Sequence, residues 1–148
     1  MPDVSPKQSD TLESVPQSEP TLRAVAMPAD TNPHGSIFGG WIMSQVDIAA
    51  GTLAAFTARG RVATVAVNSF EFHQPVYVGD VVSFYATMVR VGSTSLTVDV
   101  EVYSERFIAG QYDCIKVTEA RLTFVAIDDD GRPRQVPKID ATQEHAEK

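Results

Sequence analysis

The sequence has few of the residues that would define its chemistry at first sight. Its single cysteine, Cys114, excludes a disulfide framework and favours a packed thiol in a reducing compartment. Its three histidines are scattered along the chain, so no metal site is predicted. No basic stripe offsets the net charge of −7, which argues against a nucleic-acid partner. No phosphate-binding loop or dinucleotide fingerprint is present.

The chain also has no secretory signal and no uninterrupted apolar run. Its first residues lack the basic-then-apolar pattern of a signal peptide. The stretch 37–58 has about the length of a membrane span, roughly 20 residues, but it carries glycine, serine, glutamine, threonine and aspartate. We therefore expect a cytoplasmic protein that does not enter a membrane.

What is present suits one globular domain. Hydrophobic residues make up 43% of the 148 residues, enough for a core. Residues 1–20 are rich in serine, proline and acidic side chains without periodicity, and are predicted to be a disordered tail. A second flexible tail is expected at 138–148, which leaves 21–137 as the folded domain.

Hydrophobic periodicity predicts one long helix and five strands. The helix is expected at 39–57, with an apolar stripe at Ile42, Val46, Ala49, Leu53 and Phe56. Small residues on its other sides allow close approach to a sheet, so it should lie in the core. Alternating or β-rich segments predict strands at 21–27, 61–73, 80–91, from 96 onward, and 114–127. This order predicts an α+β fold, an antiparallel sheet wrapped around one helix, whose exposed edge favours association.

Asp47 carries the only formal charge between Asp30 and Arg59. A carboxylate in such an apolar helix costs several kcal/mol to bury unless it is hydrogen-bonded, neutralised or given a task. Gly39 and Gly40 precede it by about two turns, and a bare amide at a helix start can hold a carbonyl oxygen that gains negative charge. Asp47 could then activate water or attack that carbonyl. The alternative is a tight helix entry beside a satisfied structural aspartate.

The loop before this helix offers two further polar groups. Asn32 could orient a water molecule or a substrate carbonyl, although an Asn-Pro turn accounts for it equally well. His34 could act as an acid or base, but a solvent-exposed loop residue is the better interpretation. His73, at a strand end before Gln74 and Pro75, is expected to be structural.

Several arginines and one turn could bind an anion. Arginine suits phosphate oxygens, and a turn of glycine, serine and threonine adds backbone and hydroxyl donors. Each arginine taken singly is explained as a solvated side chain, whereas the set on an acidic protein suggests an anionic ligand. The residues are Arg59, Arg61, Arg90, Gly92, Ser93, Thr94, Ser95, Arg132 and Arg134.

Seven short motifs occur in order along the chain. They are Met27-Pro-Ala-Asp-Thr-Asn32, Gly35-Ser-Ile-Phe-Gly-Gly-Trp41, Met43-Ser-Gln-Val-Asp47, Gly60-Arg-Val-Ala-Thr-Val-Ala-Val67, Pro75-Val-Tyr-Val-Gly-Asp80, Arg90-Val-Gly and Thr123-Phe-Val-Ala126. Together they closely resemble the hotdog-fold acyl-CoA thioesterases of the YciA type. The resemblance spans about 22–137, nearly all of the expected domain.

This resemblance implies a hotdog fold whose protomers pair their sheets and assemble into hexamers, with active sites at the dimer interface. By position, Asp47 matches the catalytic acid, and Gly39 the helix-start glycine whose amide polarises the thioester carbonyl. Asn32 matches a loop residue that reaches the neighbouring protomer. Gly40 would line the substrate site. The regions that hold the nucleotide and pantetheine of coenzyme A match Arg90, Gly92, Ser93, Thr94, Ser95, Arg132 and Arg134.

The implied reaction is hydrolysis of an acyl-CoA to a free acid and CoA, with no cofactor. Asp47 would serve as general base on water or as nucleophile through a mixed anhydride, and the sequence does not distinguish the two. Two alternatives stay open. One is a hydratase of the same fold, because the loop Asp30-Thr-Asn-Pro-His34 is superficially close to a hydratase loop. The other is an acyl-CoA-binding protein without turnover.

Overall fold

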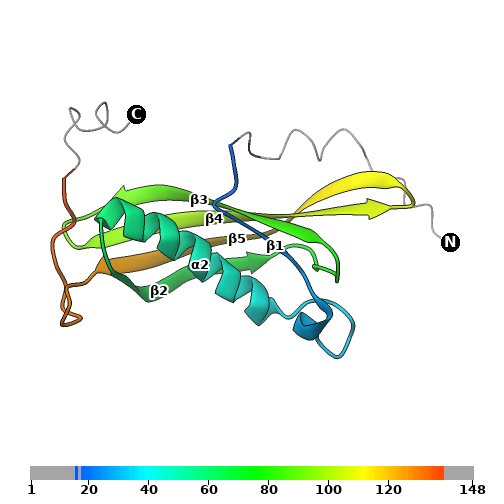
Figure 1. Cartoon of the computed structure of the whole chain (residues 1–148), viewed down its shortest axis with the longest axis horizontal. Helices are drawn as coiled ribbons and strands as arrows, with labels where there is room; N and C mark the ends of the chain where they lie inside the picture. Colours follow the sequence, from blue (N-terminus) through cyan, green and yellow to red (C-terminus); the bar gives the residue numbers. More distant parts are fainter. Residues whose placement is uncertain (1–15, 17, 139–148) are drawn as a thin grey trace.

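The computed structural model describes residues 16 and 18–138, which form one long helix packed on one sheet (Figure 1). The sheet is antiparallel, with the strand order β1-β3-β4-β5-β2. In chain order the elements are β1 (Leu22–Val25), the 3-10 turn η1 (Pro28–Asp30), α2 (Gly39–Ala58), β2 (Val62–Phe72), β3 (Val81–Val91), β4 (Ser95–Ile108) and β5 (Gln111–Ala126). This is the α+β arrangement expected from the sequence.

Of the two predicted tails, most residues lie outside the described part of the chain. The folded domain reaches at least Val136, which is 7% exposed. No helix in the described part of the chain combines the length and the apolar character that crossing a bilayer requires.

Small side chains let α2 lie close to the sheet. Ala50 and Ala54 are fully buried, and a methyl group added at Gly51 would lie 3.4 Å from the Phe124 ring. The helix ends where Arg59 adopts the left-handed conformation (φ 54°) and its N–H bonds to carbonyls of the last turn. The prediction that this helix lies in the core is therefore confirmed for the side of α2 that packs against the sheet.

Strand alternation builds the face of the sheet that contacts α2. In β4 every second residue from Leu96 to Val102 is buried, namely Leu96, Val98, Val100 and Val102. β5 begins at Gln111, earlier than expected, because the hairpin turn contains only Ala109 and Gly110. Both turn residues have positive φ, which is typical of a two-residue hairpin loop.

The two edges of the sheet differ in length. β1 has four residues at one edge, whereas β2 has eleven at the other. Val65 and Val67 on β2 are 56% and 49% exposed, and Phe56 on α2 is 80% exposed. The expectation that the whole apolar stripe of the helix lies in the core is therefore wrong at Phe56 in the single protomer. A long free edge beside exposed apolar side chains favours pairing with another chain.

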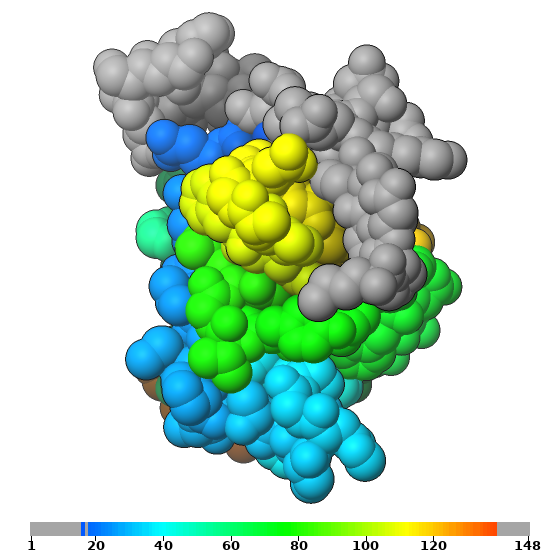
Figure 2. All heavy atoms as spheres, turned by 90° about the vertical axis from the view of Figure 1, so that its right-hand side faces the viewer, coloured from blue at the N-terminus to red at the C-terminus, as the bar shows by residue number. Residues whose placement is uncertain are grey.

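The two ends of α2 lie at opposite ends of the molecule (Figure 1). The helix starts beside η1 and the loop that follows it, and it ends near the β3–β4 turn and the segment after β5. Figure 2 views the first of these ends, where the loop before α2, the segment before β3 and the tip of the β4–β5 hairpin lie one above another.

Candidate active site

The start of α2 presents an amide that the protomer itself does not use. Gly39 is the first helical residue, and the first N–H groups of a helix have no acceptor within it. Phe38 precedes it and supplies no side-chain cap. Within the described residues the Gly39 N–H makes no hydrogen bond. The helix dipole adds positive potential here, so the amide is suited to an oxygen that gains negative charge.

A mostly apolar pocket of about 370 Å³ opens beside this amide. A methyl group added at Gly39 would lie 3.2 Å from Cζ of Phe72, so a larger side chain would crowd the pocket wall. Apolar walls with one polarised donor suit an acyl group next to a carbonyl. The lining residues are Ser36, Ile37, Gly39, Ile42, Phe72, His73, Gln74, Pro75 and Val76.

Asp47 faces β2 rather than the core. Its Oδ1 accepts a hydrogen bond of 2.7 Å from Oγ1 of Thr64, and the residue is exposed. The suggestion of a buried carboxylate is therefore wrong for the single protomer. The bond from Thr64 orients one carboxylate oxygen and leaves the other available to a ligand.

Gly39 and Asp47 are too far apart in one protomer to act on the same carbonyl. They are eight positions apart in the sequence, which is about 12 Å along an α-helix. Both lie along the free edge strand β2, since a methyl group added at Gly39 would meet the Phe72 ring and Asp47 accepts a hydrogen bond from Thr64. The interpretation that they share one carbonyl therefore does not hold within one chain.

The Asn32 side chain is used inside its own loop. Its Oδ1 accepts bonds from the N–H groups of His34 (2.9 Å) and Ser36 (3.3 Å), and its Nδ2 donates to Oγ of Ser36 (2.8 Å). This turn is the structural alternative recognised in the sequence. His34 is exposed, as expected. In the protomer Asn32 therefore orders the loop that leads into α2.

The turn predicted to bind an anion lies near the other end of α2. It contacts the segment after β5, because the N–H of Val136 donates to the Ser93 carbonyl at 2.7 Å. Gly92 donates its N–H to the Ser95 carbonyl at 2.7 Å, and a methyl group there would lie 2.8 Å from Oγ of Ser95. The tight geometry of this turn therefore accounts for the glycine without a ligand.

The arginines near this end differ in their surroundings. Arg90 and Arg132 are exposed. Arg134 is half-buried: its Nε donates to the Ile127 carbonyl at 3.0 Å, while Nη2 is buried without a partner among the described residues. A methyl group at Gly60 would lie 2.6 Å from that Nη2, so glycine makes room for the guanidinium. The structure thus places the turn and Arg134 in one region, separated from the Gly39 amide by the length of α2, roughly 30 Å.

Comparisons with known proteins agree with this architecture. The Thioesterase superfamily profile matches residues 34–106. The acyl-CoA thioester hydrolase YciA of Salmonella typhimurium is 48% identical over 131 residues, which cover 86% of this chain and 96% of that protein. HI0827, a hexameric broad specificity acyl-coenzyme A thioesterase, superposes with a TM-score of 0.76 at 43% identity over 89% of this chain and 90% of its own. Cj0915, a hexameric hotdog fold thioesterase of Campylobacter jejuni, gives 0.79 at 44% over 81% and 91%.

The chain belongs to the YciA family of acyl-CoA thioester hydrolases. The resemblance recognised in the motifs is confirmed, as are the hotdog fold and the class of enzyme. The roles of individual residues in this YciA-family chain stay predictions.

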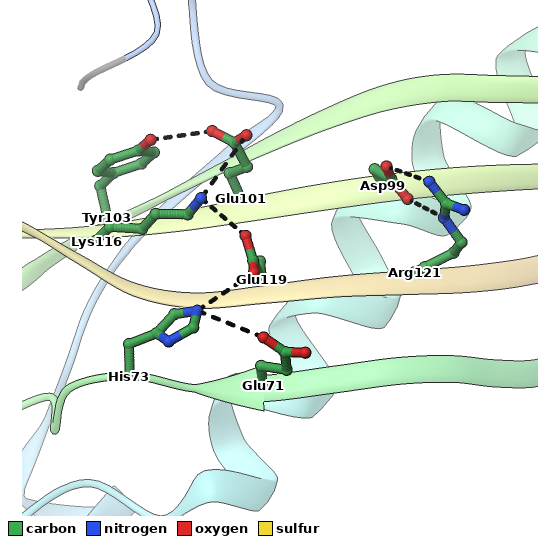
Figure 3. A network of polar contacts seen from close by, with 8 residues as sticks. All are labelled: Glu71, His73, Asp99, Glu101, Tyr103, Lys116, Glu119 and Arg121. Carbon is green, nitrogen blue, oxygen red and sulfur yellow. Dashed lines mark hydrogen bonds and ion pairs between the residues drawn. The ribbon is translucent and has the colours of Figure 1, made fainter. Parts of the chain in front are cut away.

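One polar cluster in this YciA-family chain could not be predicted from local sequence patterns. It lies on the face of the sheet turned away from α2 (Figure 3). His73, just after β2, lies within 3.5 Å of Glu119 on β5 and 4.0 Å of Glu71. These residues meet only because β2 pairs with β5, a long-range pairing that local patterns do not report. His73 is therefore more than the isolated structural residue expected.

Proposed function

We propose that this protein hydrolyses acyl-CoA thioesters in the cytoplasm, without a cofactor, at sites shared between protomers of a hexamer. Membership of the YciA family supports the substrate class, and the hexameric relatives HI0827 and Cj0915 support the assembly. The single cysteine and the negative net charge are consistent with the proposed cytoplasmic location. The observation that carries the proposal is the unused Gly39 amide beside an apolar pocket.

Pairing of two β2 edges would supply what a single protomer lacks. In a two-fold pair, two copies of β2 run antiparallel, so each end of one strand meets the opposite end of the other. The Gly39 end of one protomer then lies near the Asp47 region of its partner. Such pairing also covers Val67 on β2 and Ile48 on α2, which are 49% and 52% exposed in the protomer.

In the proposed reaction the Gly39 amide donates to the thioester carbonyl oxygen and stabilises the oxyanion. Acting as a base, Asp47 of the other protomer removes a proton from water, whose oxygen attacks the carbonyl carbon. The C–S bond breaks, and the CoA thiolate leaves and takes up the proton. Acting as a nucleophile, Asp47 instead forms a mixed anhydride that water then hydrolyses. The free carboxylate oxygen opposite the Thr64 bond suits either route.

The proposed contacts with the acyl group and with coenzyme A lie near opposite ends of α2. The acyl group occupies the apolar pocket beside Gly39 and Gly40, where Asn32 holds the approaching loop in place. The coenzyme A portion extends toward the region that contains the unpaired Nη2 of Arg134, formed by Arg90, Gly92, Ser93, Thr94, Ser95, Arg132 and Arg134. Arginine forks there suit phosphate oxygens.

The test is free thiol release from short, medium and long acyl-CoAs, with wild type compared with Asp47→Ala. We expect robust wild-type release and its loss in the variant, while circular dichroism and oligomer size stay unchanged. Release that survives the substitution would make Asp47 structural. No release from any wild-type reaction would favour turnover-free binding or a hydratase, which an enoyl-CoA assay would detect by loss of the conjugated double bond.

A single-turnover reaction in labelled water separates the two chemical routes. Label that enters the Asp47 carboxylate would show a mixed anhydride, because water then attacks the acyl-enzyme and can leave its oxygen on the enzyme. Label found only in the released acid would be consistent with direct attack by water.

A further inference from the structure

Three glutamates lie side by side across the outer face of the sheet. Glu119 on β5 is the direct cross-strand neighbour of Glu71 on β2 and of Glu101 on β4. The Glu71 side chain is 63% exposed, and those of Glu119 and Glu101 are partly exposed, at 44% and 46%. Like charges placed directly opposite one another destabilise a sheet. We call these residues the glutamate row (Figure 3).

The cations near the glutamate row do not balance it. Among the described residues Lys116 is the only permanent cation within ion-pair distance, at 2.8 Å from Glu119 and 3.9 Å from Glu101. The nearby Arg121 is engaged by Asp99 through two hydrogen bonds. Three carboxylates therefore face one ammonium, and at the Glu71 end of the row the ion-pair partner within the described part of the chain is His73.

We propose that Glu71, His73 and Glu119 bind a divalent transition-metal ion such as Zn²⁺. Their ligand atoms all lie within 4.8 Å of one another. Nε2 of His73 is 3.5 Å from Oε1 of Glu119 and 4.0 Å from Oε2 of Glu71. Ligand atoms around tetrahedral zinc are separated by about 3.4 Å, given metal–ligand distances of about 2.0–2.2 Å. A slight rotation of exposed side chains is therefore enough to bring them to one ion.

The donor set also decides which ion fits. An imidazole beside carboxylates favours zinc and similar transition metals over Mg²⁺ or Ca²⁺, which prefer oxygen ligands alone. A doubly charged ion supplies the positive charge that the glutamate row lacks. His73 also lines the pocket beside Gly39, so the ion would anchor the chain where β2 leads into that pocket wall. The proposal is independent of the hydrolase reaction.

The test is calorimetric titration of the full-length, untagged protein with ZnCl₂ at neutral pH. We expect saturable binding of one ion per protomer. Removing an outer-shell partner of a metal ligand costs about tenfold or more in affinity, so His73→Gln and Glu71→Gln, which remove ligands outright, should each lose at least that. Co²⁺ should show the visible absorption of a nitrogen-ligated ion in wild type, and His73→Gln should abolish it.

Matched variants separate coordination from diffuse attraction. Glu101→Gln removes a charge from the glutamate row without removing a ligand, and His34→Gln removes an exposed histidine elsewhere, so both should leave affinity nearly unchanged. Lys116→Met frees Glu119 from its ion pair and should tighten binding. No saturable binding, an equal loss in Glu101→Gln and Glu71→Gln, or full binding by His73→Gln would each overturn the proposal.

Discussion

At the residue scale, a substitution at Gly39 can remove the amide donor without breaking any hydrogen bond among the described residues. Proline lacks the N–H but suits the first position of a helix, and Phe38 already has the extended backbone that a following proline requires (ψ 133°). Gly39→Pro should lower kcat about 10²–10³-fold relative to Gly39→Ala, as for other oxyanion donors. The alanine variant is the control, because it keeps the N–H and makes a similar contact with Phe72. Equal activity of the two variants in thiol release would exclude this amide as the donor.

A second residue-scale prediction concerns Asp80, which is 3% exposed. It accepts bonds from Arg106 (2.9 Å), Oγ of Ser104 (2.8 Å) and the N–H of Tyr77 (3.0 Å). Asp80→Asn leaves the guanidinium of Arg106, whose side chain is 15% exposed, without its counter-charge. We expect the free energy of unfolding to fall by about 3–5 kcal/mol, measured in urea at fixed protein concentration.

The matched control for Asp80 is the exposed pair of Asp99 and Arg121. Asp99→Asn breaks an ion pair of 2.6 Å whose side chains are 39% and 48% exposed. Water screens such pairs, so the expected loss is about 0–1 kcal/mol. If Asp80→Asn and Asp99→Asn lowered the free energy of unfolding by similar amounts, burial would not explain how much the Asp80 pair contributes to stability.

At the element scale, β2 forms the long edge of the sheet that we propose pairs with another chain. Val67 is 49% exposed on this edge strand, and a lysine there would place a charge in the proposed pairing surface. Val67→Lys should therefore reduce oligomer size by light scattering and lower thiol release in parallel. Thr87→Lys, at an exposed position on β3, should change neither. Full assembly of the Val67 variant would place the interface elsewhere.

The sequence predicted elements better than it predicted their surroundings. Periodicity located α2 and the strands because side-chain spacing is a local property. It put Phe56 in the core and suggested burial of Asp47, because exposure depends on which strand ends the sheet. That edge is fixed by the pairing of β2 with β5, which no local pattern reports. Local patterns also placed Gly39 and Asp47 on one helix without showing that their separation of about 12 Å keeps them from acting on one carbonyl within a single chain.

At the scale of the whole molecule, each proposed site takes Gly39 from one chain and Asp47 from the other. Two chains that carry different defects can therefore form one intact site together. Asp47→Ala and Gly39→Pro should each be inactive alone. In a mixed pair, one site combines both defects, while the other combines an intact Gly39 amide with an intact Asp47 carboxylate. Equal mixing makes half of the pairs mixed, each with one intact site of two, so co-refolding should restore about a quarter of wild-type thiol release.

This recovery depends only on whether the two groups come from different chains. Were both groups to act within one chain, every protomer in the mixture would carry a defect, and no combination would be active. Co-refolding Asp47→Ala with Asp47→Asn controls for recovery caused by refolding itself, since neither chain supplies the carboxylate. If the mixture of Asp47→Ala and Gly39→Pro chains released no thiol although its oligomer size and folding were intact, a shared site would be contradicted. The separation of about 12 Å along α2 predicts recovery instead, because it keeps the two groups of one chain apart.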